Sequence, residues 1–101
     1  MESVEHIFAV WHLTETEQSA LLRRHEFASS GSLPKRLVLF ESIARSLEIL
    51  YAREDLIGNW LRSPNRHELF HGSPPLDVMC LSESEDLERI AALLRAWSAG
   101  N

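Results

Sequence analysis

Cysteine is nearly absent from this sequence of 101 residues, which contains only Cys80. One cysteine cannot form an intrachain disulfide, and such sparse use is typical of a reducing cytoplasm, where Cys80 serves as a small packed hydrophobe. The sequence also lacks an apolar run of membrane-spanning length, and Glu2 and Glu5 stand where a secretory signal would carry Lys or Arg. We therefore expect a cytoplasmic protein that does not associate with membranes.

Positively charged residues are fewer than negatively charged ones. Ten Lys and Arg residues stand against fifteen Asp and Glu residues, which gives a formal net charge of −5 and an isoelectric point near 5.5. Such a chain has no overall basic field to attract nucleic acid or anionic lipid, although a local basic patch remains compatible with these numbers.

Strand-like alternation of apolar and polar residues is absent as well, and apolar residues recur at helical spacing instead. The pattern predicts helices over residues 3–12, 15–25 and 35–52, a shorter helix through Trp60 and Leu61 that stops before Pro64, a short helix from Pro75, and a last helix that ends before Gly100. The fold class is therefore all-α, a compact bundle of about five to six helices. Thr14 and Glu17 form a predicted capping box at the second helix, and Ser82 and Glu85 form another before the last.

A small, polar stretch over residues 28–32, followed by Pro34, is the one clear interior linker. It divides the chain into segments 1–34 and 35–101, which we expect to pack as one unit.

Residues 67–71 read His-Glu-Leu-Phe-His, which fits the pattern by which metalloproteases bind a catalytic zinc. In those enzymes both histidines lie within one long helix, whereas Pro64 and Gly72 leave room here for barely two turns. No downstream pattern places a third ligand. We interpret the stretch as a loop with Leu69 and Phe70 facing the core, and a zinc hydrolase is a remote alternative.

The motifs around this loop resemble a known family. Trp60-Leu61-x-x-Pro64-Asn65 is followed by Leu69-Phe70-x-Gly72 and then by Pro75-Leu76-Asp77. In order and spacing they are similar to the toxin-binding domain of the Xre/MbcA/ParS antitoxins, and the resemblance extends over residues 36–101. In that family the motifs mark a helix end, a glycine-containing loop and a short helix that begins with proline.

The resemblance implies that the protein is the antitoxin of a type II toxin–antitoxin pair, whose partner is a RES-domain toxin that consumes NAD. Such an antitoxin has no catalytic residues, metal or cofactor, and it covers the active site of the toxin partly with its own C-terminal end. Carried over to this chain, the toxin-binding residues are Arg95, Trp97, Ser98, Gly100 and Asn101, together with Arg66 and His67 of the loop. Trp97 also continues the stripe of Leu87, Ile90 and Leu94, which favours a position in the core.

Relatives often carry an N-terminal DNA-binding helix-turn-helix, and the alternative function is a DNA-binding transcriptional regulator. The candidate phosphate contacts are Arg23, Arg24, Lys35 and Arg36. Between His25 and Leu37, however, a recognition helix does not fit easily, so we expect a degenerate helix-turn-helix in residues 1–34. Homodimer formation is compatible with the resemblance.

Overall fold

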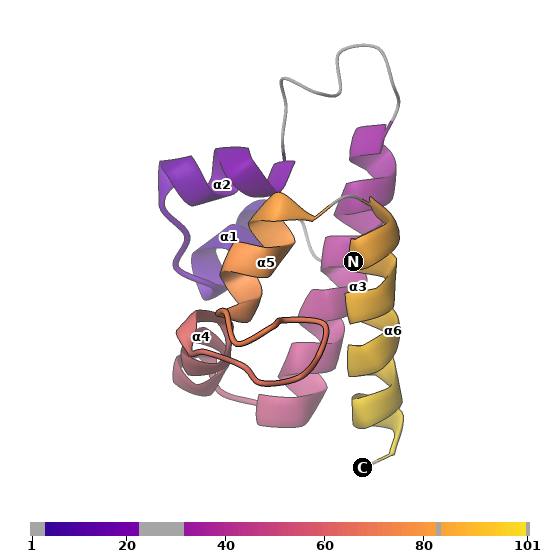
Figure 1. The fold of residues 1–101 in the computed structure, drawn as a ribbon. Helices are drawn as coiled ribbons and strands as arrows, with labels where there is room; N and C mark the ends of the chain where they lie inside the picture. The colour runs from indigo at the N-terminus through magenta and orange to yellow at the C-terminus, as the bar shows by residue number, and fades with distance from the viewer. Residues whose placement is uncertain (1–3, 23–31, 83, 101) are drawn as a thin grey trace.

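The computed structural model describes residues 4–22, 32–82 and 84–100, and of these it leaves the side chains of residues 4, 32–35 and 84 undescribed. Within this part of the chain there are six helices and no strand, which confirms the all-α prediction (Figure 1). The helices are α1 (Val4–Val10), α2 (Glu15–Leu22), α3 (Ser32–Tyr51), α4 (Glu54–Arg62), α5 (Pro75–Leu81) and α6 (Ser84–Ala99). Across the described residues, no helix is long and apolar enough to cross a membrane.

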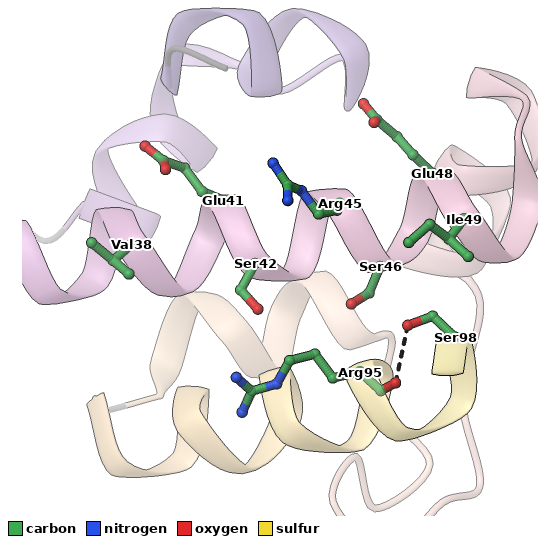
Figure 2. A pocket seen from close by; sticks show the side chains of 9 residues that line it. All are labelled: Val38, Glu41, Ser42, Arg45, Ser46, Glu48, Ile49, Arg95 and Ser98. Atoms are coloured by element: carbon green, nitrogen blue, oxygen red, sulfur yellow. Dashed lines mark hydrogen bonds between the residues drawn. The ribbon is translucent and has the colours of Figure 1, made fainter. Parts of the chain in front are cut away.

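The longest helices, α3 and α6, lie side by side and run in the same direction, and they make the most extensive helix contact (Figures 1 and 2). Helices α1, α2, α4 and α5 form a second layer against this pair (Figure 1). The predicted apolar stripes of the two long helices meet in the core, which also receives Trp11 and Leu21 from the N-terminal helices. The fully buried members from the two long helices are Phe40, Ile43, Leu47, Leu87 and Leu94.

Helix α3 begins at Ser32, three residues before the predicted start, so Pro34 lies inside its first turn. The predicted start is wrong because it assumed that the helix could begin only after Pro34. The first turn of a helix has amides without an intrahelical acceptor, so a proline there removes no hydrogen bond.

The predicted capping box of α2 is confirmed. The Thr14 amide donates to Glu17 Oε1 at 3.0 Å, and the Glu17 amide donates to Thr14 Oγ1 at 3.1 Å. Arg62, the last residue of α4, adds a two-pronged ion pair to Glu17, with Nη1 and Nη2 2.9 and 3.1 Å from the carboxylate oxygens. The same guanidinium donates to the His12 carbonyl at 3.0 Å. The α1–α2 turn is thereby joined to the end of α4.

The second predicted capping box falls partly on residue 83, which lies outside the described residues. The Ser82 hydroxyl closes α5 by donating to the Val78 carbonyl at 2.6 Å.

A buried arginine holds three helices together. Arg36 in α3 is 1% exposed, and its Nη1 donates to the Ser82 carbonyl at 2.7 Å while its Nε donates to the Leu21 carbonyl at 2.9 Å. These two carbonyls lie at the C-terminal ends of α5 and α2, where helix carbonyls lack intrahelical partners and the helix dipole favours a cation. The guanidinium also lies over the Phe40 ring, 5.4 Å from its centroid.

We expect Arg36→Met to lower the free energy of unfolding by about 2–4 kcal/mol, because methionine fills similar space but leaves the Leu21 and Ser82 carbonyls without the guanidinium. Urea denaturation followed by circular dichroism measures the change. The matched control is Arg89→Met on the exposed side of α6, which should change the stability by no more than about 0.5 kcal/mol. Equal stability of the two variants would contradict the proposed role of Arg36.

The Glu17–Arg62 pair should make stability depend on pH in the acid range. The Arg62 guanidinium lowers the pKa of Glu17 from its ordinary value of 4.5, so the folded protein binds this proton less tightly than the unfolded chain. The stabilisation is complete above the unfolded pKa and is lost as the pH falls through the lower pKa of the folded state.

The Glu17→Gln variant retains the capping oxygen. When the pH is lowered from about 7 to about 3, it should therefore lose less stability than the unmodified protein. Urea denaturation at both pH values measures this difference. Glu15→Gln on the same helix removes a carboxylate that makes no ion pair with Arg62, and it should lose as much stability as the unmodified protein. An unchanged acid response in Glu17→Gln would show that the pair does not couple protonation to folding.

Candidate functional site

Asn65 organises the loop between α4 and α5. Its side-chain Oδ1 accepts a hydrogen bond from the His67 amide at 2.9 Å. Its own amide donates to the Ser73 carbonyl at 3.2 Å, and its carbonyl accepts from the Gly72 amide at 2.8 Å. The first bond shapes the start of the loop as an Asx turn, and the other two close its base. Pro64 and Asn65 thus mark the boundary between α4 and a closed loop.

The far side of the loop is a tight turn that presses one aromatic ring into the core. The Phe70 and His71 amides both donate to the His67 carbonyl, at 2.8 and 3.1 Å. His71 and Gly72 then adopt φ values of 51° and 82°, a left-handed geometry that glycine accepts without steric cost. Phe70 is completely buried, and its ring packs at a right angle to that of Trp60 of α4, with ring centroids 5.7 Å apart. The loop is therefore anchored at its tip as well as at its base.

The same turn contains the His-Glu-x-x-His string, so the two histidines are not one turn apart in a helix as a zinc protease requires. His67 Nδ1 already accepts a hydrogen bond from the Leu69 amide at 3.1 Å. Within the described residues, no three His, Cys, Asp or Glu side chains are grouped so that they could hold a metal ion. The zinc-hydrolase alternative thus lacks its geometric premise.

Helix α5 restarts the chain directly after the loop. Pro74 occupies the N-cap position, where it provides no side-chain cap, and Pro75 takes the first helical position. Pro75 and Leu76 are buried, whereas Asp77 is exposed in the first turn. The family motif residues therefore serve mainly to fix the path of the chain, with Leu61 and Phe70 in the core and Leu69 half-buried.

His67 brings the loop to the C-terminal end of α6. Its ring makes an edge-to-face contact with Trp97, with centroids 5.7 Å apart and planes at 84°. Trp97 remains 36% exposed, and Arg66, which precedes His67 in the chain, is exposed too. The core prediction for Trp97 is wrong, because the indole packs against the loop and the loop covers only part of it. Arg66, His67 and Trp97 together form what we call the loop–helix surface.

The other candidate residues of α6 lie on a different face. Arg95 and Ser98 line a cavity of about 460 Å³ between α3 and α6, and the Ser98 hydroxyl donates to the Arg95 carbonyl at 3.0 Å (Figure 2). We call this cavity the α3–α6 groove; its remaining lining residues are Val38, Glu41, Ser42, Arg45, Ser46, Glu48 and Ile49. Gly100 follows α6 and is exposed, and Asn101 lies outside the described residues.

Sequence reasoning missed the α3 side of this groove. Val38 and Ile49 are 63% and 59% exposed, although both belong to α3, which supplies Phe40, Ile43 and Leu47 to the core. A second stripe, formed by Val38, Ser42, Arg45 and Ile49, could have indicated this face, but it is weaker than the buried stripe beside it. Glu41 and Arg45, which the helical spacing places one turn apart, do not form an ion pair with each other in the structure (Figure 2).

The structure corrects one of the four candidate phosphate contacts. Arg36 is inside the protein, where its guanidinium bonds to main-chain carbonyls, so it does not present a cation to DNA. Arg23 and Arg24 lie outside the described residues, and so does the side chain of Lys35.

The surroundings of the only cysteine disfavour its thiolate form. Cys80 in α5 is half-buried against the core, and burial raises the pKa of its thiol to about 11. A thiol with that pKa is protonated at neutral pH, and it is the thiolate that reacts. The expectation of a small packed hydrophobe fits this environment.

Comparison with known proteins assigns this arrangement to a family. Residues 46–100 match the model of the family described as the antitoxin Xre/MbcA/ParS C-terminal toxin-binding domain. An uncharacterized protein, y4oB, of Sinorhizobium fredii (strain NBRC 101917 / NGR234) is 32% identical over an alignment of 101 positions, gaps included, that covers 89% of this chain and 77% of that protein. No solved structure gives a significant match. The family match takes in more than half of the chain, including the loop and all of α6, and the chain therefore belongs to the Xre/MbcA/ParS family of antitoxin toxin-binding domains.

Proposed function

We propose that this protein is the antitoxin of a type II toxin–antitoxin pair and acts in the bacterial cytoplasm. Its partner is a RES-type toxin that degrades NAD, and neutralisation takes place by direct binding over the active site of the toxin. The antitoxin itself performs no chemistry. Membership of a toxin-binding family supports the partner class, and the contact between His67 and Trp97 supports the place of binding.

The loop–helix surface has the composition of a binding hot spot. Tryptophan and arginine are the residue types that most often dominate the energy of protein interfaces. Here the Trp97 indole is 36% exposed, and the exposed Arg66 is the chain neighbour of its contact residue His67. The indole offers apolar area to a partner while its ring remains held from behind by His67.

This surface is also preorganised. His67 is fixed by the Asx turn of Asn65 and by the bond from the Leu69 amide to its Nδ1. Phe70 anchors the same turn in the core. Side chains that are already held in place lose little conformational entropy on association, so more of the contact energy contributes to affinity.

The position of the surface fits an occluding role. Trp97 lies in the last turn of α6, and the exposed Gly100 follows it directly. A partner that binds Trp97 therefore also meets the end of the helix and the residues after it, Gly100 and Asn101. We infer that this end of the chain covers the opening of the toxin active site, with Arg95 and Ser98 on the adjoining face of the same turn.

The first experiment uses the full chain as bait in lysate of the native host, with mass spectrometry to identify the captured protein. We expect a RES-domain toxin whose NAD-degrading activity stops when the antitoxin is added at equimolar concentration. Recovery of a toxin of another class would overturn the RES assignment, and recovery of no toxin would count against the antitoxin role.

Trp97→Ala should weaken binding of the recovered toxin by about 30-fold, the loss typical of a hot-spot tryptophan, and His67→Ala should weaken it less, because histidine acts through the orientation of the indole. Isothermal titration calorimetry measures both. The control is Leu81→Ala at the end of α5, which truncates a large hydrophobic side chain that is 82% exposed, more than any other among the described residues. If Leu81→Ala weakened binding and Trp97→Ala did not, the loop–helix surface would not be the binding site.

A further inference from the structure

Another cavity, of about 310 Å³, lies between the end of α3, helix α4 and the start of the loop. Its apolar lining residues are Tyr51, Leu56, Trp60 and Pro64. Leu56 is 38% exposed, Pro64 is exposed, and the two aromatic residues are half-buried. The cavity therefore presents aromatic and proline rings to solvent. We call it the α3–α4 hollow.

The hollow is uncharged and contains hydrogen-bond donors. None of its lining residues carries a charge, although 25% of the residues of the chain do. Its polar groups include the Tyr51 hydroxyl and the carboxamides of Asn59 and Asn65. Asn65 already uses its Oδ1 to accept from the His67 amide, so its Nδ2 is the group that it offers to a ligand. A charged ligand would lose hydration here without gaining a counter-charge, whereas a neutral ligand with carbonyl acceptors is matched.

Among the common forms of bound peptide, one fits these walls. Strand addition requires an exposed sheet edge, and the described residues contain no strand. A bound helix uses its carbonyls for its own hydrogen bonds, so it would leave the donors of the hollow without acceptors. A polyproline II segment has no internal hydrogen bonds, so its carbonyls are available, and its proline rings pack in grooves lined by aromatic residues.

We propose that the α3–α4 hollow binds an extended, proline-bearing segment, and that this segment belongs to the toxin. A proline ring of the segment packs against Tyr51 and Trp60, while Asn59 and Asn65 donate to its carbonyls. The assignment of the segment to the toxin rests on the proposed function, whereas the form of the ligand rests on the walls of the hollow alone.

The hollow is continuous with the loop–helix surface. Ring contacts lead from Trp60 to Phe70, from Phe70 to His67 and from His67 to Trp97, with centroids 5.7, 6.2 and 5.7 Å apart. Asn65 lines the hollow and also bonds to the His67 amide, so one residue borders both sites. A partner seated on Trp97 therefore has only the loop to cross before it meets the hollow.

The placement of the hollow in the fold agrees with a toxin as the partner. The end of α3, helix α4, the loop and the last turn of α6 lie at the same end of the molecule (Figure 1). All lining residues of the hollow fall within residues 46–100, the part that matches the toxin-binding domain. A segment held in the hollow adds a second anchor to the contact at Trp97.

Titration with a short synthetic oligoproline peptide tests the form of the ligand without the toxin. The full chain is labelled with an NMR isotope, and the indole N–H signals of its tryptophans are followed. The Trp60 signal should shift and saturate with a dissociation constant on the order of 1 mM, because a short segment offers little contact area. The signal of the buried Trp11 should stay in place. A Trp60 signal that does not shift, or that shifts equally with a Gly-Ser peptide of the same length, would overturn the proposal.

Leu56→Arg places a charge in the hollow and should weaken binding of both the oligoproline peptide and the toxin about tenfold or more. The matched control is Leu81→Arg at the end of α5, whose side chain is 82% exposed and lies outside the hollow. It should bind both ligands as the unmodified protein does. Asn59→Asp, which removes a donor from the exposed side of α4, should act in the same direction and serves if Leu56→Arg does not fold.

Failure of the hollow and failure of the proposed function give different results. If Trp97→Ala weakens toxin binding and Leu56→Arg does not, the hollow has no part in toxin binding and the proposed function stands. If the unmodified chain binds no toxin, the proposed function fails together with the assignment of the segment to the toxin. The oligoproline titration then still decides whether the hollow binds a proline-bearing segment.

Discussion

The burial of the Arg36 guanidinium is the interaction on which the arrangement of the other helices depends. A buried cation requires well-placed acceptors, and two of them here are carbonyls at the C-terminal ends of α2 and α5. Those two segments are far apart in sequence, and α3 holds both at once through one side chain. Neither helix end can move without leaving the charge or a carbonyl unsatisfied, a cost of several kcal/mol in a small domain.

The position of the candidate binding surface follows from this constraint. Fixing the end of α5 also fixes its beginning, and the loop that precedes α5 is closed at its base by Asn65. From that base the chain turns so that Phe70 enters the core and His67 reaches Trp97. The Glu17–Arg62 pair performs the same task on the other side of the loop by holding the end of α4. A rigid loop on two fixed helices is a suitable platform for an exposed indole.

Local signals in the sequence predicted most of the fold. The predictions that failed concern contacts between segments that are distant in the sequence. The capping box of Thr14 and Glu17 was correct because all its partners lie within four residues. Arg36 was mistaken for a surface cation because its acceptors, Leu21 and Ser82, come from distant segments. The stripe that placed Trp97 in the core gave the correct side of α6 but could not show that a loop, rather than a helix, would cover it. Pro64 and Gly72, which flank the His-Glu-x-x-His string, were sufficient to predict that it lies in a loop and not in a long helix.

The last turns of α6 present two separate faces because their side chains point in different directions. Arg95 and Trp97 are two residues apart, which separates them by about 200° around the helix. Arg95 lines the α3–α6 groove, whereas Trp97 contacts His67 of the loop. The candidate residues at the end of α6 therefore do not form one continuous surface, and Trp97 is the one that the loop holds in place.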